Sequence, residues 1–220
     1  HGSIYLYPMF SENRRLERRK EILEGLRDKF EVNHVSDLSF YEMQYAFLEG
    51  TGSMVLDRVN KIAYACVSPR TSIRTLDNLC KEIEYTSVTF ESLDLKGDQI
   101  YHTNVMMSVG ETVAICCLES IPNLIERKML KQQLLKTGKT VIEITYAQMG
   151  KFAGNAFEVL SDDGKSYYVL SKSSVNVLSE QQKGMIEDNS EIVGIDISTI
   201  EHVGGGSVRC MMAGFFNYPK

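Results

Sequence analysis

The chain has 220 residues, of which 43% are hydrophobic and 24% are charged, and this composition is that of a globular protein with a sizeable core. Its formal net charge of −5 excludes the strongly basic surface by which proteins bind nucleic acid or an anionic membrane. No apolar run approaches the roughly 20 residues that span a bilayer, and the N-terminus lacks a signal-peptide pattern. We therefore expect a cytoplasmic protein that binds neither membranes nor nucleic acid.

Three pairs of short apolar runs follow one another along the chain, and each pair is typical of a β-hairpin. Before these pairs, the sequence pattern predicts a strand at residues 4–10, a helix at 11–30 and a strand at 31–37. The hairpin strands follow at residues 47–57 and 62–68, 100–109 and 112–120, and 152–160 and 166–173. Behind the hairpins come helical patterns at 73–84, 124–136 and 179–187, and third strands at 86–94, 139–145 and 190–198.

The repeated unit is therefore ββαβ, and the predicted fold class is α+β. The beginning of the chain matches a unit without its first strand, and residues 204–216 match a first strand without a partner. We expect either that the two ends pair and close a ring, or that residues upstream of His1 complete it. Pairing of these end strands with another subunit, giving a homo-oligomer, is a further alternative.

The repeat has a period of 53 residues, which separates Glu49 from His102 and His102 from Asn155. One more period ends two residues before Cys210. Equivalent positions of units in a ring lie at equal height around one axis, so we expect these four residues to converge on first strands. A thiol, an imidazole and a carboxylate together can perform covalent catalysis.

The five cysteines are expected to be reduced thiols, because their number is odd and no CxxC pair or cysteine–histidine cluster is present. We expect no metal and no organic cofactor. The four cysteines in predicted strands or helices are expected in the core: Cys66, Cys80, Cys116 and Cys117.

Three motifs carry a resemblance to a known family: "FLEGTGSMVLD", "YHTNVMM" and "GGGSVRCM". They are similar to those of the guanidino-group-modifying (pentein) superfamily of arginine deiminases, dimethylarginine dimethylaminohydrolases and amidinotransferases. The sequence most resembles bacterial arginine-deiminase-related proteins associated with citrulline use, over nearly its whole length. The resemblance implies the pentein fold, a five-bladed propeller of ββαβ units, with residues 1–220 as a single catalytic domain that lacks N-terminal residues.

The resemblance also implies roles for individual residues. Cys210 matches the nucleophile, His102 the general acid and base, and Glu49 the carboxylate that holds the substrate. The implied reaction is thiolate attack on a guanidino or ureido carbon of a small molecule such as arginine, a covalent amidino-enzyme intermediate, and hydrolysis. Expected substrate-binding residues are Asn104, Asn155, Gly205 and Gly206, because the amides can line the pocket and the glycines let the backbone approach a planar group.

Alternatives within and outside the enzyme class remain open from the sequence. An amidinotransferase would pass the same intermediate to an amine, and a non-catalytic pentein would use the ring for binding alone. The histidine motif departs from the usual His-X-Asp pattern, since the chain has Asn104 two residues after His102. An amide can bond a guanidinium but cannot neutralise it, so the substrate group need not be as cationic as arginine.

Overall fold

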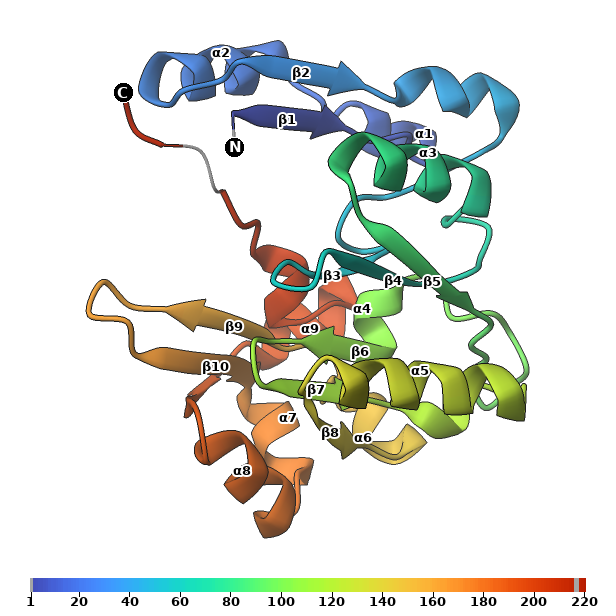
Figure 1. Ribbon diagram of the computed structural model, residues 1–220, viewed down its shortest axis with the longest axis vertical. Helices are drawn as coiled ribbons and strands as arrows, with labels where there is room; N and C mark the ends of the chain where they lie inside the picture. The colour runs from blue at the N-terminus through green and yellow to red at the C-terminus, as the bar shows by residue number, and fades with distance from the viewer. Residues whose placement is uncertain (1, 216–217) are drawn as a thin grey trace.

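The computed structural model describes residues 2–215 and 218–220 and contains four small sheets. The first sheet has two parallel strands, β1 (Ser3–Leu6) and β2 (His34–Asp37), with Ser3 opposite His34. The helices α1 (Glu12–Arg15) and α2 (Lys20–Lys29) connect these strands (Figure 1). The half unit expected at the start of the chain is therefore present.

The other three sheets share one topology, an antiparallel hairpin followed by a parallel third strand. Their strands are β3 (Val55–Asp57), β4 (Ile62–Cys66) and β5 (Thr86–Phe90); β6 (Met107–Val109), β7 (Val113–Cys116) and β8 (Thr140–Glu143); and β9 (Phe157–Leu160), β10 (Ser166–Ser171) and β11 (Glu191–Ile195). The crossover helices are α3 (Ile73–Ile83), α5 (Leu124–Lys136) and α8 (Glu180–Glu187). The repeated ββαβ unit is therefore confirmed.

Local sequence explains where the crossover helices begin. The Asn123 side chain accepts bonds from the backbone N–H groups of Ile125 and Glu126 at the start of α5. Ser179 and Gln182 form a reciprocal capping box at the start of α8. Shorter helical segments complete the structure: η1 (Ser39–Gln44), α4 (Thr103–Met106), η2 (Leu118–Ser120), α6 (Tyr146–Met149), α7 (Lys172–Val177), α9 (Ser198–Gly204) and η3 (Val208–Met211).

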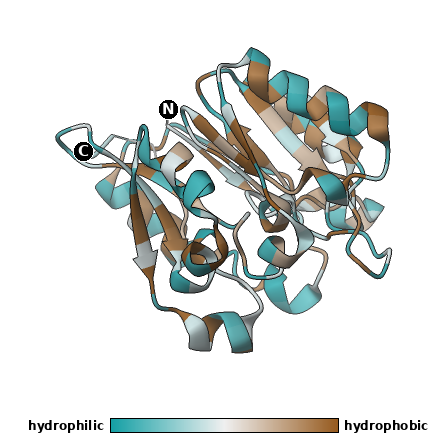
Figure 2. Ribbon diagram, turned by 90° about the horizontal axis from the view of Figure 1, so that it is seen from below, coloured by the Kyte–Doolittle hydropathy of each residue, from teal (hydrophilic) through white to brown (hydrophobic). Residues whose placement is uncertain are grey.

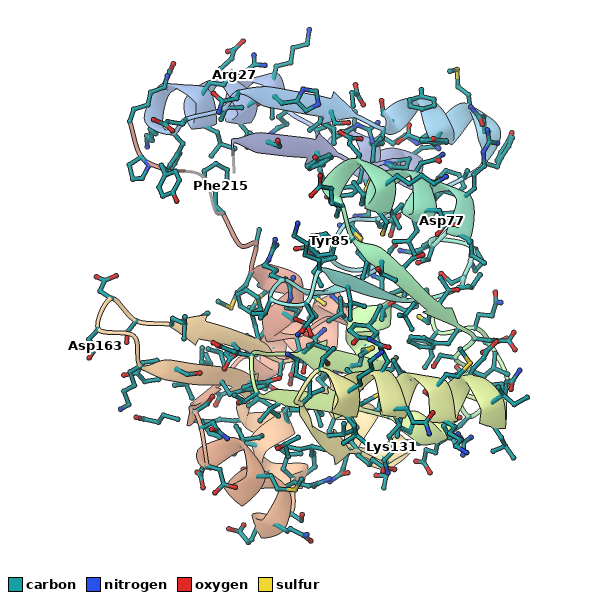
Figure 3. The ribbon with its side chains drawn as sticks, in the orientation of Figure 1. Arg27, Asp77, Tyr85, Lys131, Asp163 and Phe215 are labelled. Carbon is teal, nitrogen blue, oxygen red and sulfur yellow. The ribbon has the colours of Figure 1, made fainter. Side chains whose placement is uncertain are left out.

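The first strands of neighbouring units contact one another, β3 with β6 and β6 with β9. These contacts bring the equivalent ends of the hairpins to the middle of the molecule, beside α4 and α9 (Figure 1). The middle strands β4 and β7 are buried at every residue, and Figure 2 shows apolar residues concentrated along the strands. Charged groups such as Lys131 and Asp163 lie on the outside, Asp163 at the tip of the β9–β10 hairpin (Figure 3).

The end of the chain returns to the first unit. Phe30 and Pro219 form an antiparallel bridge, and the backbone N–H of Glu31 donates to the Tyr218 carbonyl at 2.9 Å. The Lys220 N–H donates to the Lys29 carbonyl at 3.0 Å. The described end of the chain therefore pairs with the first unit through residues 218–220, and not through a strand at residues 204–215 as the ring expected from the sequence required.

Two expectations about the secondary structure near the ends of the chain are wrong. Residues 204–215 do not form a strand, because Gly204 ends α9, Gly205 takes a left-handed φ of 66°, and Val208–Met211 form a 3-10 helix; residue 216 lies outside the described part. The single helix expected at 11–30 is two helices, because the chain leaves the helical path at residues 16–19, where Arg18 pairs with Glu42 at 2.6 Å.

A buried ion pair joins two neighbouring units. Lys139 Nζ lies 3.1 Å from Asp57 Oδ2, and both side chains are 1% exposed. Lys139 also donates to the Glu111 carbonyl at 2.8 Å, and Asp57 accepts bonds from Asn60. The pair therefore ties the end of β3 to the second hairpin and to the residue that leads into β8.

We predict that Asp57→Ala lowers the free energy of unfolding by about 3–5 kcal/mol, because it leaves the Lys139 ammonium buried without its counter-ion. Urea unfolding followed by circular dichroism measures the change. The control is Glu84→Ala, which breaks an exposed pair with Lys61 and should cost less than about 1 kcal/mol. Equal effects of the two substitutions would contradict the prediction.

Candidate active site

Glu49 lies in the turn that precedes β3, and its carboxylate is 1% exposed. Oε2 lies 2.6 Å from His102 Nε2 and 3.5 Å from Arg70 Nη1, and Oε1 accepts the backbone N–H of Phe10 at 2.9 Å. Burial opposes ionisation, but the bonds from His102 and Phe10 and the charge of Arg70 outweigh it and lower the pKa of the Glu49 carboxyl. The carboxylate is therefore held in its charged form.

His102 is the residue directly before α4, and its neighbours fix its position. Thr103 Oγ1 donates to the Ser53 carbonyl at 2.5 Å and accepts the Cys66 backbone N–H at 2.9 Å. With Nε2 on Glu49, the other ring nitrogen, Nδ1, faces Gly52, where an added Cβ would lie 2.9 Å away. Glycine at position 52 therefore lets the imidazole pack against the backbone, where a side chain would displace it.

Cys210 is exposed and lies in η3, where two buried amides face its sulfur. Asn155 Nδ2 lies 3.3 Å from Sγ and Asn104 Nδ2 lies 3.7 Å from it. Asn155 Nδ2 also donates to the Asn104 carbonyl at 2.8 Å, and its Oδ1 accepts the Arg209 backbone N–H at 3.0 Å. Asn155 thus connects the second, third and last parts of the repeat at the sulfur.

The Asn104 amide has one polar atom without a partner. Its Oδ1 is buried and has no hydrogen-bond partner among the described residues, while its backbone N–H donates to the Gly52 carbonyl at 3.3 Å. A buried acceptor without a bond is costly. An N–H group of a ligand that reaches Cys210 can satisfy it.

The two glycines expected to bind substrate have identifiable local roles. Gly205 adopts a left-handed φ of 66° and ends α9. A Cβ added at Gly206 would lie 3.1 Å from the Cys210 Cβ and 3.2 Å from its Sγ. These glycines therefore shape the turn around Cys210.

The four other cysteines are buried free thiols, which confirms the expectation from the sequence. Burial raises the pKa of the Cys66, Cys80 and Cys117 thiols to about 11 and that of Cys116 well above its ordinary value. These four are therefore thiols at neutral pH, the form that is a poor nucleophile.

The structure brings together all the polar residues that the sequence predicted: Glu49 with His102, and Asn104 and Asn155 with Cys210. They lie in the turns and short helices next to the first strands, not on the strands as expected, because glycine-containing turns and the start of α4 occupy these positions. The period still located them, since equivalent turns of neighbouring units lie side by side.

Sequence reasoning missed Arg70 and the N-terminal segment. The Arg70 guanidinium lies 5.0 Å from the Tyr101 ring and 5.7 Å from the Phe10 ring. Arg14 also lies near the site: its bond to Glu17 raises its pKa most, and the charges of Glu49 and Cys210 add to the effect. These residues carried no signal in the sequence because they stand outside the 53-residue period.

Neither a metal site nor a membrane span is found in the described residues. No group of three or more His, Cys, Asp or Glu side chains among them is placed to hold a metal ion. Their helices are too short or too polar to cross a bilayer.

Comparison with protein families gives one match over residues 1–217, to a model described as "N,N dimethylarginine dimethylhydrolase, eukaryotic". Comparison with curated protein sequences gives no significant match. The structure is similar to ArgZ, an arginine dihydrolase from cyanobacteria, with a TM-score of 0.73 at 13% identity, covering 100% of this chain and 31% of that chain.

Two further solved structures are similar. Unliganded AgrE has a TM-score of 0.73 at 17% identity, covering 96% of this chain and 28% of that chain. A dimethylarginine dimethylaminohydrolase adduct has a TM-score of 0.57 at 14% identity, covering 94% and 71%. The chain thus spans less than a third of full-length ArgZ and AgrE. At these identities the likeness establishes the shared fold, and the pentein fold that the motif resemblance implied is confirmed.

We predict that the stabilising contribution of Glu49 disappears in acid. Its folded-state pKa lies below the ordinary 4.5, so its contribution is complete above pH 4.5 and is lost as the pH falls through the lowered value. The difference in unfolding free energy between the wild type and Glu49→Gln should therefore be largest near neutral pH and shrink below pH 4.5. Urea unfolding at several pH values tests this, and a difference independent of pH would contradict it.

Proposed function

Since the chain belongs to the N,N-dimethylarginine dimethylhydrolase family, we propose that it is a cysteine-dependent hydrolase of a guanidino or ureido group on a small molecule. The observation that carries this proposal is the arrangement of Cys210 against two amide N–H groups, one of them on Asn104, which lies two residues after a histidine bonded to a buried carboxylate. Among the structurally similar proteins, the N-terminal domain of ArgZ has been solved with a covalently bound reaction intermediate. AgrE has been solved with L-arginine and with ornithine and NAD+. An amino acid of that kind is the substrate class that we propose.

Each step of the reaction has a residue of the site assigned to it. The Cys210 thiolate attacks the central carbon of the guanidino group, and the amide N–H groups of Asn155 and Asn104 stabilise the charged sulfur. His102 Nε2 bonds to Glu49, so Nδ1 is the nitrogen that donates a proton to the departing amine. The C–N bond breaks and an amidino-thioether remains on Cys210. His102 Nδ1 then takes a proton from a water molecule whose oxygen attacks the amidino carbon, and the C–S bond breaks to return the Cys210 thiolate. With arginine the products are citrulline and ammonia.

Arg70 is the residue that we propose for the far end of the substrate. It is the guanidinium beside Glu49, it is 29% exposed, and it faces the aromatic rings of Phe10 and Tyr101. A carboxylate of an amino-acid substrate can pair with such a group in two parallel bonds. The two rings hold the guanidinium in place without neutralising it.

Three further expectations remain part of the proposal. We propose that residues 1–220 act as one catalytic domain in the cytoplasm, with which the five free thiols are consistent. A homo-oligomer stays a prediction. Transfer of the amidino group to an amine would use the same intermediate and remains the alternative to hydrolysis.

We predict that a haloacetamidine labels Cys210 selectively, because the amidinium group enters a site that holds a carboxylate while the other four cysteines are buried. Peptide mass mapping of all five cysteines measures this, with neutral iodoacetamide for comparison. His102→Ala should abolish turnover but leave the labelling site unchanged. Equal labelling of Cys210 by the two reagents would contradict the assignment, and product analysis with and without an added amine separates hydrolysis from transfer.

We predict that Asn104→Asp favours arginine over citrulline by about tenfold in kcat/KM, because a charge-assisted bond to a guanidinium exceeds a neutral one by about 1.4 kcal/mol. Steady-state kinetics with both substrates measure the ratio. The exposed Asn189→Asp change is the control for added negative charge. An unchanged ratio would remove Asn104 from substrate recognition.

A further inference from the structure

Glu201, in the middle of α9, is a buried carboxylate that the proposed reaction does not use. The residue is 8% exposed, and among the described residues it forms no ion pair with a lysine, arginine or histidine. A carboxylate removed from water is costly unless local bonds compensate. The hydrogen bonds that Glu201 accepts should therefore explain why a carboxylate is buried here.

Glu201 holds the turn that precedes the nucleophile at two points. Its backbone carbonyl accepts the Gly205 N–H at 3.2 Å, at the residue with the left-handed φ of 66°. Its side-chain Oε1 accepts the Ser207 hydroxyl at 2.7 Å. One residue thus fixes both ends of the Gly205–Ser207 turn.

Ser207 passes this constraint to Cys210. Ser207 is fully buried, and its carbonyl accepts the Cys210 backbone N–H at 3.0 Å, which starts η3. Between them, Gly206 packs so closely that an added Cβ would lie 3.2 Å from the Cys210 sulfur. A displacement of the turn would therefore move Sγ away from its position 3.3 Å from Asn155 Nδ2.

We propose that Glu201 is a positioning residue, which fixes the Cys210 sulfur against the amides of Asn155 and Asn104 through the hydroxyl of Ser207. The inference rests on the proposed role of Cys210 as the nucleophile. Glu201 acts as a hydrogen-bond acceptor in this arrangement, so the bond to Ser207 matters and the negative charge does not. This distinguishes a positioning role from an electrostatic one.

The test compares Glu201→Ala, Glu201→Gln and Ser207→Ala with Ser198→Ala, an exposed serine in the same helix. The measurements are kcat, KM and the pH profile of Cys210 alkylation by iodoacetamide. The two variants that remove the bond should lose about 10–100-fold in kcat with little change in KM, and alkylation of Cys210 at neutral pH should change in rate as the sulfur leaves Asn155. Glu201→Gln should stay within about threefold of the wild type, because its amide oxygen accepts the same bond.

The buried cysteines report on folding in the same experiment. Labelling of Cys66, Cys80, Cys116 or Cys117 would show that a variant has unfolded, and the decision then rests on Glu201→Gln and Ser207→Ala. The double variant Glu201→Ala/Ser207→Ala should be no worse than Glu201→Ala alone, because both remove one interaction.

The proposal is overturned if Ser207→Ala keeps wild-type kcat and alkylation, or if Glu201→Gln loses as much as Glu201→Ala. Failure of the proposed function is a separate result. It would appear in the wild type as absent turnover and unselective amidine labelling, while the iodoacetamide profiles would still show whether Glu201 positions the sulfur.

Discussion

The buried carboxylate of Glu49 is the point at which three separate segments of the chain meet. The backbone of Phe10 reaches it from the first unit, His102 from the second hairpin, and Arg70 from the end of the first hairpin. Because a buried carboxylate is stable only when donors surround it, these segments must be in place together. The same bonds orient His102, so the packing of the first two units and the position of this imidazole depend on one set of contacts.

The Cys210 side of the site is built with amides in place of charged groups. Asn155 faces the sulfur, the Asn104 carbonyl and the Arg209 backbone at once, and it is 1% exposed. A neutral amide can donate to a thiolate and to a backbone carbonyl without the desolvation cost of a charge. The site thus has a charged side, with Glu49 bonded to His102, and a neutral side, with two amides against the Cys210 sulfur.

Rigid elements support both sides. The Lys139–Asp57 pair joins two units in the core, Thr103 ties the start of α4 to Ser53 and Cys66, and Glu201 holds the turn before η3. Reacting groups need positions fixed to a fraction of an ångström. Two glycines contribute to this precision. A side chain at position 52 would displace His102, and one at position 206 would displace Cys210.

The sequence alone determined the ββαβ repeat, its helices and third strands, and the period that relates Glu49, His102 and Asn155, because alternating apolar runs and turn residues are local signals. It also indicated that four cysteines are buried, and the motif resemblance pointed to Cys210. Only the tertiary structure decided that these residues lie in turns, that Asn155 bonds to the sulfur, and that Phe10, Arg70 and Glu201 support the site. The physical reason is distance along the chain: these bonds join residues up to 106 positions apart, and partners so far apart are chosen by packing, which no local pattern encodes.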